Sequence, residues 1–170
     1  MPYPEPLVAP MRQELTRLGV TELRTAQDVD AALADDTGTT LVIINSVCGC
    51  AAANARPAVA MAQQAPVQPD RYLTVFAGQD LEATARMREH LAGIPPSSPF
   101  MALLKEGEPV FVVERRHIEG RSAGAIAMDV ANAFATHCGT DAAAADAPSR
   151  PDVAEKAAPE SVPSTFRSIL

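Results

Sequence analysis

The sequence predicts an α/β sandwich in which helices cover a mixed sheet. Two continuously apolar, β-branched segments, TTLVII at 39–44 and YLTVF at 72–76, are typical of buried central strands. Helical patterns alternate with these strands along the chain, as expected for a layered α/β fold. Two later apolar segments, 100–105 and 110–114, are joined by the turn residues 106–109 and predict a hairpin that closes the sheet.

The chain before the first central strand is predicted to form two helices and a short strand. Apolar residues recur at helical spacing over 7–18. A short strand at 22–24 follows, and a second helix is expected over 25–34. Thr25 can cap this helix, because Asp28 stands at the position that completes a capping box.

Three further helices are expected after the first central strand. The first covers 48–64, which is rich in alanine, the best helix former. Pro57 lies inside it, and its ring would clash with the carbonyl of Ala53 and kink the helix. The others cover 80–91 and 122–137. Asp80 can cap the helix over 80–91, in which the residues expected to share one side are Leu81, Thr84, Ala85, Arg88 and Leu91. In the helix over 122–137, the residues expected to share one side are Ile126, Val130, Ala133 and Phe134.

Length and charge restrict the class of protein. The 170 residues suit one domain with its own core. The net charge of -7 and an aromatic content of only 4% argue against a nucleic-acid binder and against a polybasic membrane-surface protein. The N-terminus lacks the pattern of a signal peptide, and no apolar run approaches the roughly 20 residues that span a bilayer. We therefore expect a cytoplasmic protein.

The composition changes near the C-terminus. Alanine and proline alternate with scattered charges from Gly139 onward, a pattern typical of a linker. Residues 1–138 are accordingly predicted to form one domain, and residues 139–170 a disordered Ala/Pro-rich tail.

The feature that points to chemistry is Cys48-Gly49-Cys50, where a buried strand is followed by a helix. A helix N-terminus has unpaired N–H groups and the positive end of the helix dipole, which both stabilise a thiolate. The pKa of Cys48 is therefore expected to lie below its ordinary value, which makes Cys48 the candidate nucleophile. Gly49 gives the backbone freedom to bring the sulfurs together, and Cys50 can then act as the resolving thiol.

Other interpretations of the cysteines remain open. The pair could consist of small buried residues without chemistry. It could also belong to a metal or iron–sulfur carrier, with Cys138 as a third ligand. Zinc needs four ligands, or three and a water, and the remaining candidates are not at zinc-finger spacing from Cys48. Those candidates are Cys138, His90, His117 and His137.

Two sets of arginines are secondary candidates. Arg56, two turns into the helix after the cysteines, is expected to form an ion pair or to contact a substrate. Arg115-Arg116-His117 follows a strand and is expected to be solvated, or to meet an anionic client or cofactor.

These features together resemble the thioredoxin fold, in which an apolar strand leads through a short turn to a cysteine at a helix start. The later segment Ser98-Pro99, just before an apolar strand, matches the same pattern. The resemblance implies a thioredoxin-like three-layer sandwich, with a mixed central sheet flanked by helices. It also implies that Pro99 is a cis-proline opposite the reactive cysteine and that the Ser98-Pro99 loop holds the client chain.

The chain is more specifically similar to the bacilliredoxin family, small thioredoxin-like proteins with a CGC motif. The similarity covers roughly residues 5–138, and the tail after Cys138 departs from it. The segments that carry it are 42–52, 55–58, 75–80, 85–89, 96–99 and 117–120.

The resemblance implies a thiol–disulfide oxidoreductase that removes bacillithiol from S-bacillithiolated client proteins. In this mechanism Cys48 attacks the mixed disulfide, and Cys50 or a second bacillithiol resolves the product. Gly49, Ser98 and Pro99 are the expected substrate contacts. Bacillithiol is then a thiol co-substrate, with no bound cofactor and no metal. A general protein disulfide isomerase would use the same residues.

Overall fold

Strand β2 (Thr39–Asn45) lies at the centre of the sheet with all of its residues buried. The computed structural model describes residues 1–139, and its strands are ordered β1-β3-β2-β4-β5. Strand β3 is parallel to β1 and β2, whereas β4 is antiparallel to β2 and β5. The predicted mixed sheet is therefore confirmed. The other strands are β1 (Thr21–Glu22), β3 (Arg71–Phe76), β4 (Phe100–Lys105) and β5 (Glu108–Val113).

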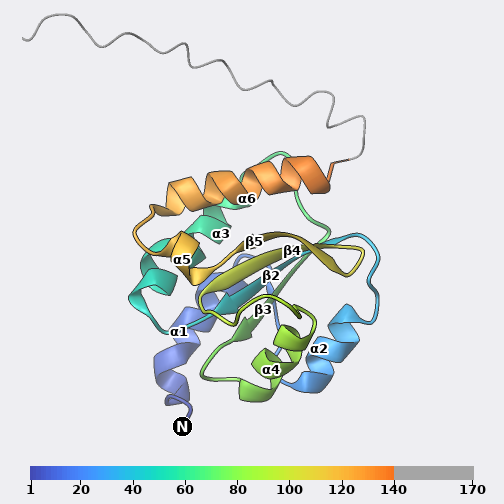
Figure 1. The fold of residues 1–170 in the computed structure, drawn as a ribbon. Coiled ribbons are helices and arrows are strands. Elements are labelled where there is room, and N and C mark those ends of the chain that lie inside the picture. The colour runs from blue at the N-terminus through green and yellow to red at the C-terminus, as the bar shows by residue number, and fades with distance from the viewer. Residues whose placement is uncertain (140–170) are drawn as a thin grey trace, which may run out of the picture.

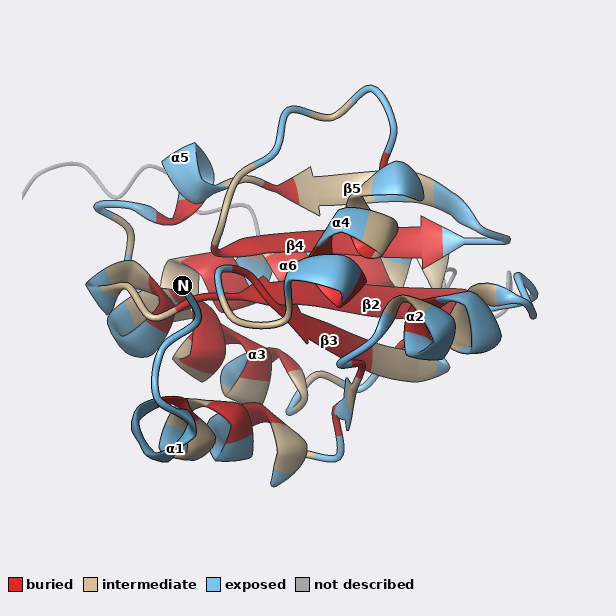
Figure 2. Cartoon of the chain, turned by 90° about the horizontal axis from the view of Figure 1, so that it is seen from below, coloured by how far each residue is buried: buried red, intermediate tan, exposed pale blue. Residues whose placement is uncertain are grey.

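The alternating side chains of β2 divide the core in two, because successive residues of a strand point to opposite faces. Leu41 and Ile43 pack with residues of α3 and α6, whereas Val42 and Ile44 pack with residues of α2 and α4. Figure 1 shows these helix pairs on opposite sides of the sheet, and Figure 2 shows β2 buried along its length and β4 buried up to its exposed last residue. The expected thioredoxin-like three-layer sandwich is observed. The helices are α1 (Glu5–Thr16), α2 (Ala26–Leu33), α3 (Arg56–Ala62), α4 (Leu81–Glu89), α5 (Arg115–Ile118) and α6 (Ala123–His137).

The helix predicted over 48–64 is divided into two elements. A π-helical segment, η1 (Ala51–Ala55), comes first, and α3 begins at Arg56. The Arg56 N–H donates to the Ala51 carbonyl five residues earlier, and Pro57, which has no N–H to donate, follows in the first turn of α3. The predicted helix is therefore π-helical up to Ala55 and α-helical from Arg56 onward, with the change of helix type where the sequence places the proline.

The capping box of α2 is confirmed. The Thr25 hydroxyl accepts a hydrogen bond from the Asp28 N–H at 3.1 Å, and the Asp28 carboxylate accepts one from the Thr25 N–H at 2.9 Å. The face predicted for α6 is also buried as expected, at Ile126, Val130 and Phe134.

The prediction for α4 is confirmed in part. Thr84 and Leu91 of the predicted side are buried, but Leu81 is 59% exposed, and the helix also buries Ala83 and Met87, which were not predicted. Ala83 and Met87 are four residues apart and so share a face, which packs on the sheet beside Val42. Asp80 precedes the helix but makes no capping hydrogen bond. Its carboxylate binds a buried guanidinium, and such a charged hydrogen bond is stronger than a cap.

That guanidinium belongs to Arg12, only 6% exposed on α1. Arg12 donates to Asp80 at 2.6 Å and 3.0 Å, to Glu5 at 2.9 Å, and also to Glu22 on β1. Its guanidinium carbon lies 5.2 Å from the centre of the Phe76 ring. One buried charge therefore ties α1 to β1, to the end of β3 and to the start of α4.

No helix within residues 1–139 is long and apolar enough to cross a membrane. Residues 140–170, nearly all of the predicted tail, lie outside the described residues. The division into a domain and a tail therefore stays a prediction.

Replacing Arg12 with alanine should lower the free energy of unfolding by about 3 kcal/mol, because the largely buried carboxylate of Asp80 would keep only a long contact, 3.9 Å, with Arg24. Denaturant unfolding measures this effect. The matched control is Arg86→Ala, which removes exposed ion pairs to Asp30 and Glu89 and should cost less than about 1 kcal/mol. Equal losses in the two variants would contradict a special role for the buried charge.

Candidate active site at Cys48 and Cys50

Cys48 lies just after the end of β2, where the chain turns into η1. Its carbonyl accepts hydrogen bonds from the N–H groups of Ala51 at 3.0 Å and Ala52 at 3.2 Å, so helical bonding begins at this cysteine. Both cysteines of the pair are half-buried, and Gly49 between them is exposed. The predicted strand, turn and helix start are therefore in place.

The two sulfurs are close to each other and to a hydroxyl group. The Sγ atoms of Cys48 and Cys50 are 2.7 Å apart, and both residues are free cysteines. The Ser46 hydroxyl donates to the Cys48 sulfur at 3.1 Å. A Cβ built on Gly49 would meet no atom within 4 Å, and the residue has no positive φ. The two sulfurs do approach each other as expected, but neither a positive φ nor a close neighbour at position 49 requires glycine for it.

The environment drives the pKa values of the two thiols apart. Burial alone would raise the pKa of Cys48, but hydrogen bonds from the thiol of Cys50, the hydroxyl of Ser46 and the N–H groups of Ala51 and Cys50 together lower it. Burial raises the pKa of Cys50, and so do its hydrogen bond to Cys48 and the negative charge there, against an opposing effect of Arg115. Cys48 is thus the thiol of the pair that ionises first.

A buried hydrogen-bond network supports the turn before Cys48. Arg56 is 3% exposed, and one of its terminal nitrogens donates to the Asn45 side-chain oxygen and to the Ser46 carbonyl, both at 3.1 Å. The same Asn45 oxygen accepts from the Ser46 N–H at 2.9 Å. Arg56 also pairs with Glu14 of α1 at 2.7 Å. Of its two expected roles, the ion pair is the one observed.

The loop before β4 reaches the same site. The Ser98–Pro99 peptide bond is cis, as expected from the resemblance. Pro99 is buried, whereas Ser98 and Cys48 line one surface pocket of about 290 Å³. Arg115, at the start of α5, donates to the Ser98 carbonyl at 3.3 Å. The full lining of the pocket is Tyr3, Ser46, Val47, Cys48, Ala77, Gly78, Arg88, Ser98 and Arg115.

Sequence reasoning missed Ser46 and Arg88 as members of the site. A hydroxyl two residues before a cysteine is a signal that could have identified Ser46. Arg88 was interpreted only as part of a helix side, and no local pattern relates it to a cysteine 40 residues earlier.

The remaining cysteine and the histidines are elsewhere. Cys138 packs against the core beside Thr39, at the opposite end of β2 from Cys48. His117 accepts a hydrogen bond from the Glu114 N–H at 3.1 Å and so helps to begin α5. Within residues 1–139, no three His, Cys, Asp or Glu side chains come together in a group that could hold a metal ion. The structure therefore does not bring Cys138 to the pair as a third ligand.

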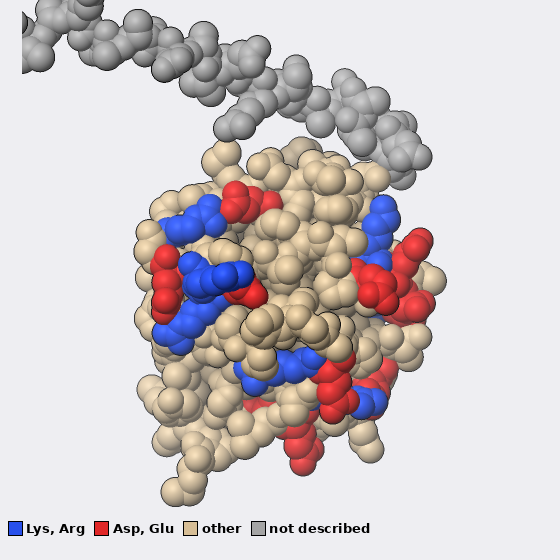
Figure 3. Space-filling view, in the orientation of Figure 1, with Lys and Arg blue, Asp and Glu red and all other residues tan. Residues whose placement is uncertain are grey.

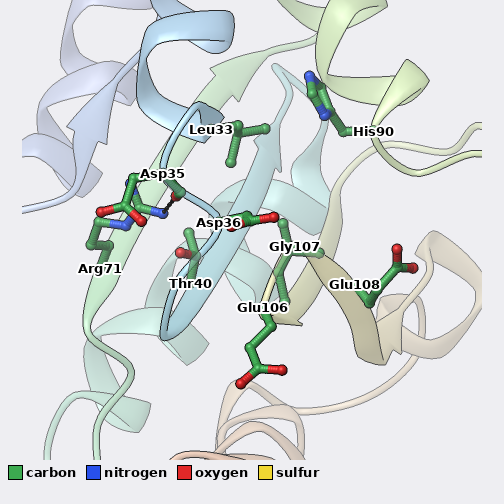
Figure 4. Close-up of a pocket in the computed structure, with 10 residues that line it drawn as sticks. Leu33, Asp35, Asp36, Thr40, Arg71, His90, Glu106, Gly107 and Glu108 are labelled. Atoms are coloured by element: carbon green, nitrogen blue, oxygen red, sulfur yellow. Dashed lines mark hydrogen bonds between the residues drawn. The ribbon is translucent and has the colours of Figure 1, made fainter.

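A second pocket, of about 180 Å³, lies at that opposite end of the sheet. Figure 4 shows acidic side chains around it, including Asp35, Glu106 and Glu108, with Arg71 and His90 from neighbouring elements. Arg71 is held by the Ala32 and Asp35 carbonyls. No cysteine lines this pocket, so it does not belong to the thiol site.

Replacing Ser46 with alanine removes one donor to the Cys48 sulfur and should therefore raise the pKa of Cys48. The rate of Cys48 alkylation at neutral pH should fall about fivefold, the effect of one hydrogen bond. Iodoacetamide labelling across pH, followed by peptide mass mapping, measures both quantities. Cys138 is the internal control, since burial raises its pKa independently of Ser46. An unchanged pH profile at Cys48 would show that the hydroxyl does not stabilise the thiolate.

Comparison with known proteins gives the family. The model of a family described as "Disulphide isomerase" matches residues 3–138. A bacilliredoxin of Salinibacter ruber is 64% identical over 172 residues, which cover 99% of each chain. The match therefore includes the tail, which was expected to depart from the family. A bacilliredoxin of Bacillus licheniformis is 52% identical over 137 residues, covering 80% of this chain and 95% of its own.

Among solved structures, a Fasciola hepatica thioredoxin matches 68% of this chain and 99% of its own, with 14% identity and a TM-score of 0.46. The sequence matches extend over the whole described region, including the turn that holds Cys48 and Cys50. This chain belongs to the bacilliredoxin family.

Proposed function

We propose that this protein removes bacillithiol from S-bacillithiolated client proteins. Its family and its site support the broader class of thiol–disulfide oxidoreductase. The observation that carries the proposal is the contrast between two adjacent thiols, one with a lowered and one with a raised pKa. Thiol–disulfide exchange requires a thiolate that attacks the disulfide and a second thiol that stays protonated until the mixed disulfide has formed. The reaction is placed in the cytoplasm, a compartment that keeps cysteines reduced.

In the first step the Cys48 thiolate attacks the bacillithiol sulfur of the client's mixed disulfide. A disulfide forms between Cys48 and bacillithiol, and the bond between bacillithiol and the client breaks. The client sulfur leaves with the electron pair and takes up a proton, so the client returns as a free thiol. Ser98, which lines the pocket beside Cys48, and the exposed Gly49 are the proposed contacts on the client side.

The geometry favours Cys50 as the resolving thiol over a second bacillithiol. Its sulfur is already 2.7 Å from that of Cys48. The negative charge on Cys48 is one cause of the raised pKa of Cys50, and this charge disappears once Cys48 is in a disulfide. Cys50 then ionises more readily and attacks the Cys48 sulfur, which releases bacillithiol as a thiol and leaves a Cys48–Cys50 disulfide.

A general disulfide isomerase is the second candidate, because that is the description of the matching family model. It would use the same Cys48 thiolate to attack a protein disulfide. A second client thiol would then attack the mixed disulfide between Cys48 and the client and release Cys48. The two functions differ in whether the sulfur attacked belongs to a small thiol or to a protein.

Intact mass spectrometry with a bacillithiolated client tests the proposal. The wild-type protein should return the client as a free thiol, whereas Cys48→Ser should return none. Cys50→Ser should accumulate a bacillithiol adduct on Cys48, because the internal resolving step is lost. Cys138→Ser, which changes the cysteine at the far end of β2, is the matched control and should remain active.

Full activity in Cys48→Ser would refute the assignment of the nucleophile. Repair of scrambled disulfides by a wild-type protein that never forms the adduct would replace the proposal with the isomerase. If Cys50→Ser turns over normally with added bacillithiol and shows no adduct, an external thiol resolves the intermediate.

A further inference from the structure

Two arginines line the pocket beside the reactive sulfur. Arg88 comes from α4 and Arg115 from the start of α5, and both share with Cys48 and Ser98 the lining of the 290 Å³ pocket. Guanidinium groups bind carboxylates in a bidentate geometry that a single hydroxyl or amide cannot provide. The pocket therefore has the chemistry of an anion site next to the nucleophile.

Arg88 differs from every other arginine of residues 1–139. Each of the others donates at least one side-chain hydrogen bond to the protein. The Arg88 Nε is buried and has no hydrogen-bond partner in the described part of the chain, and no ion pair is formed there by its guanidinium. Buried donors without partners are rare in proteins, and each calls for an explanation.

The acids that could neutralise Arg88 are paired with other groups. Figure 3 shows basic and acidic side chains interleaved over α5, where Arg115 contacts Glu119 at 2.6 Å and Arg116 contacts Glu114. Arg86 on α4 forms ion pairs with Glu89 of the same helix at 2.5 Å and with Asp30 of α2 at 2.5 Å. Within residues 1–139 no acid forms an ion pair with Arg88, which lines the pocket beside Cys48.

Arg115 contributes a second positive charge at the same place. It holds the Ser98 carbonyl, and its charge interacts with both cysteine sulfurs, most strongly with that of Cys50. The charge of Arg115 is nevertheless shared with Glu119. Arg88 is therefore the residue whose removal tests the anion site without disturbing the thiols.

We propose that Arg88, assisted by Arg115, binds a carboxylate of the small thiol that Cys48 removes from its client. This inference rests on the proposed function and adds a specificity for anionic small thiols. Bacillithiol fits, because its malate group carries carboxylates. The pocket, of about 290 Å³, has roughly the smallest volume typical of sites for small ligands, and its Ser98 side remains open to the client. Binding the carboxylate there would keep the sulfur of the small thiol beside Cys48, so that the client sulfur is the one that leaves.

The experiment compares three mixed disulfides of one client, made with bacillithiol, with glutathione and with 2-mercaptoethanol. The first two small thiols carry carboxylates, whereas the third is neutral. In Arg88→Gln, kcat/KM for release of the client thiol should fall about 10-fold for the two anionic thiols and stay nearly unchanged for 2-mercaptoethanol. Arg88→Lys should recover part of the loss, since it restores charge without the planar fork.

The matched control is Arg86→Gln, which removes the same charge from the same helix at a residue outside the pocket. It should leave all three rates unchanged. An equal loss on all three disulfides in Arg88→Gln would show a structural role and overturn the inference, and so would no loss on any of them. The iodoacetamide reactivity of Cys48, measured in parallel, should be the same in Arg88→Gln and wild type.

The two proposals can fail separately. If the wild-type protein releases glutathione but not bacillithiol, and Arg88→Gln loses the former, the proposed function is wrong and the anion site stands. If bacillithiol is removed equally well by wild type and Arg88→Gln, the function stands and the anion site is wrong.

Discussion

The guanidinium of Arg56 is the interaction on which the site depends most. It is almost fully buried, and a buried charge is tolerated only with partners that satisfy it. Two of those partners, the Asn45 side chain and the Ser46 carbonyl, belong to the turn between β2 and Cys48. Glu14 of α1 balances the charge from the other side. Moving the turn would leave the buried guanidinium without two of its hydrogen-bond partners. The free-energy cost of that loss holds the turn, and therefore Cys48, in place.

The contrast between the two thiols follows from that fixed turn. Burial raises the pKa of both cysteines, and the distribution of donors, together with the negative charge that Cys48 places beside Cys50, separates them. The turn directs the Ser46 hydroxyl toward the Cys48 sulfur, and the N–H groups of Ala51 and Cys50 also lower the pKa of Cys48. Cys50, one residue further, is left to act as a donor to Cys48. An asymmetry of nucleophile and resolving thiol therefore needs no difference in burial, only a backbone that presents its donors to one sulfur.

Local patterns in the sequence predicted the central strands, the helices other than α5 and the place of the cysteines, because each depends on neighbouring residues. The continuous apolar run of β2, the Thr25 capping box and the break near Pro57 are of this kind. The other errors concern contacts between distant residues. Asp80 was interpreted as a cap, but it binds Arg12, 68 residues earlier, and the buried face of α4 was set by the sheet. Arg88 was missed for the same reason, since only the fold brings it to the pocket that contains Cys48.

The negative net charge of the protein explains why a cation beside Cys48 would help an anionic small thiol to bind. A chain with a net charge of -7 repels an anionic small thiol at long range, although salt screens this repulsion beyond about 8 Å. Inside that distance the nearest charges determine the electrostatic energy of the bound carboxylate. The nucleophile, once ionised, is a thiolate that repels this carboxylate. A cation paired with a neighbouring acid would offset little of this. Arg88 lines the pocket and forms no ion pair among the described residues, so its attraction for the carboxylate can offset repulsion by the thiolate.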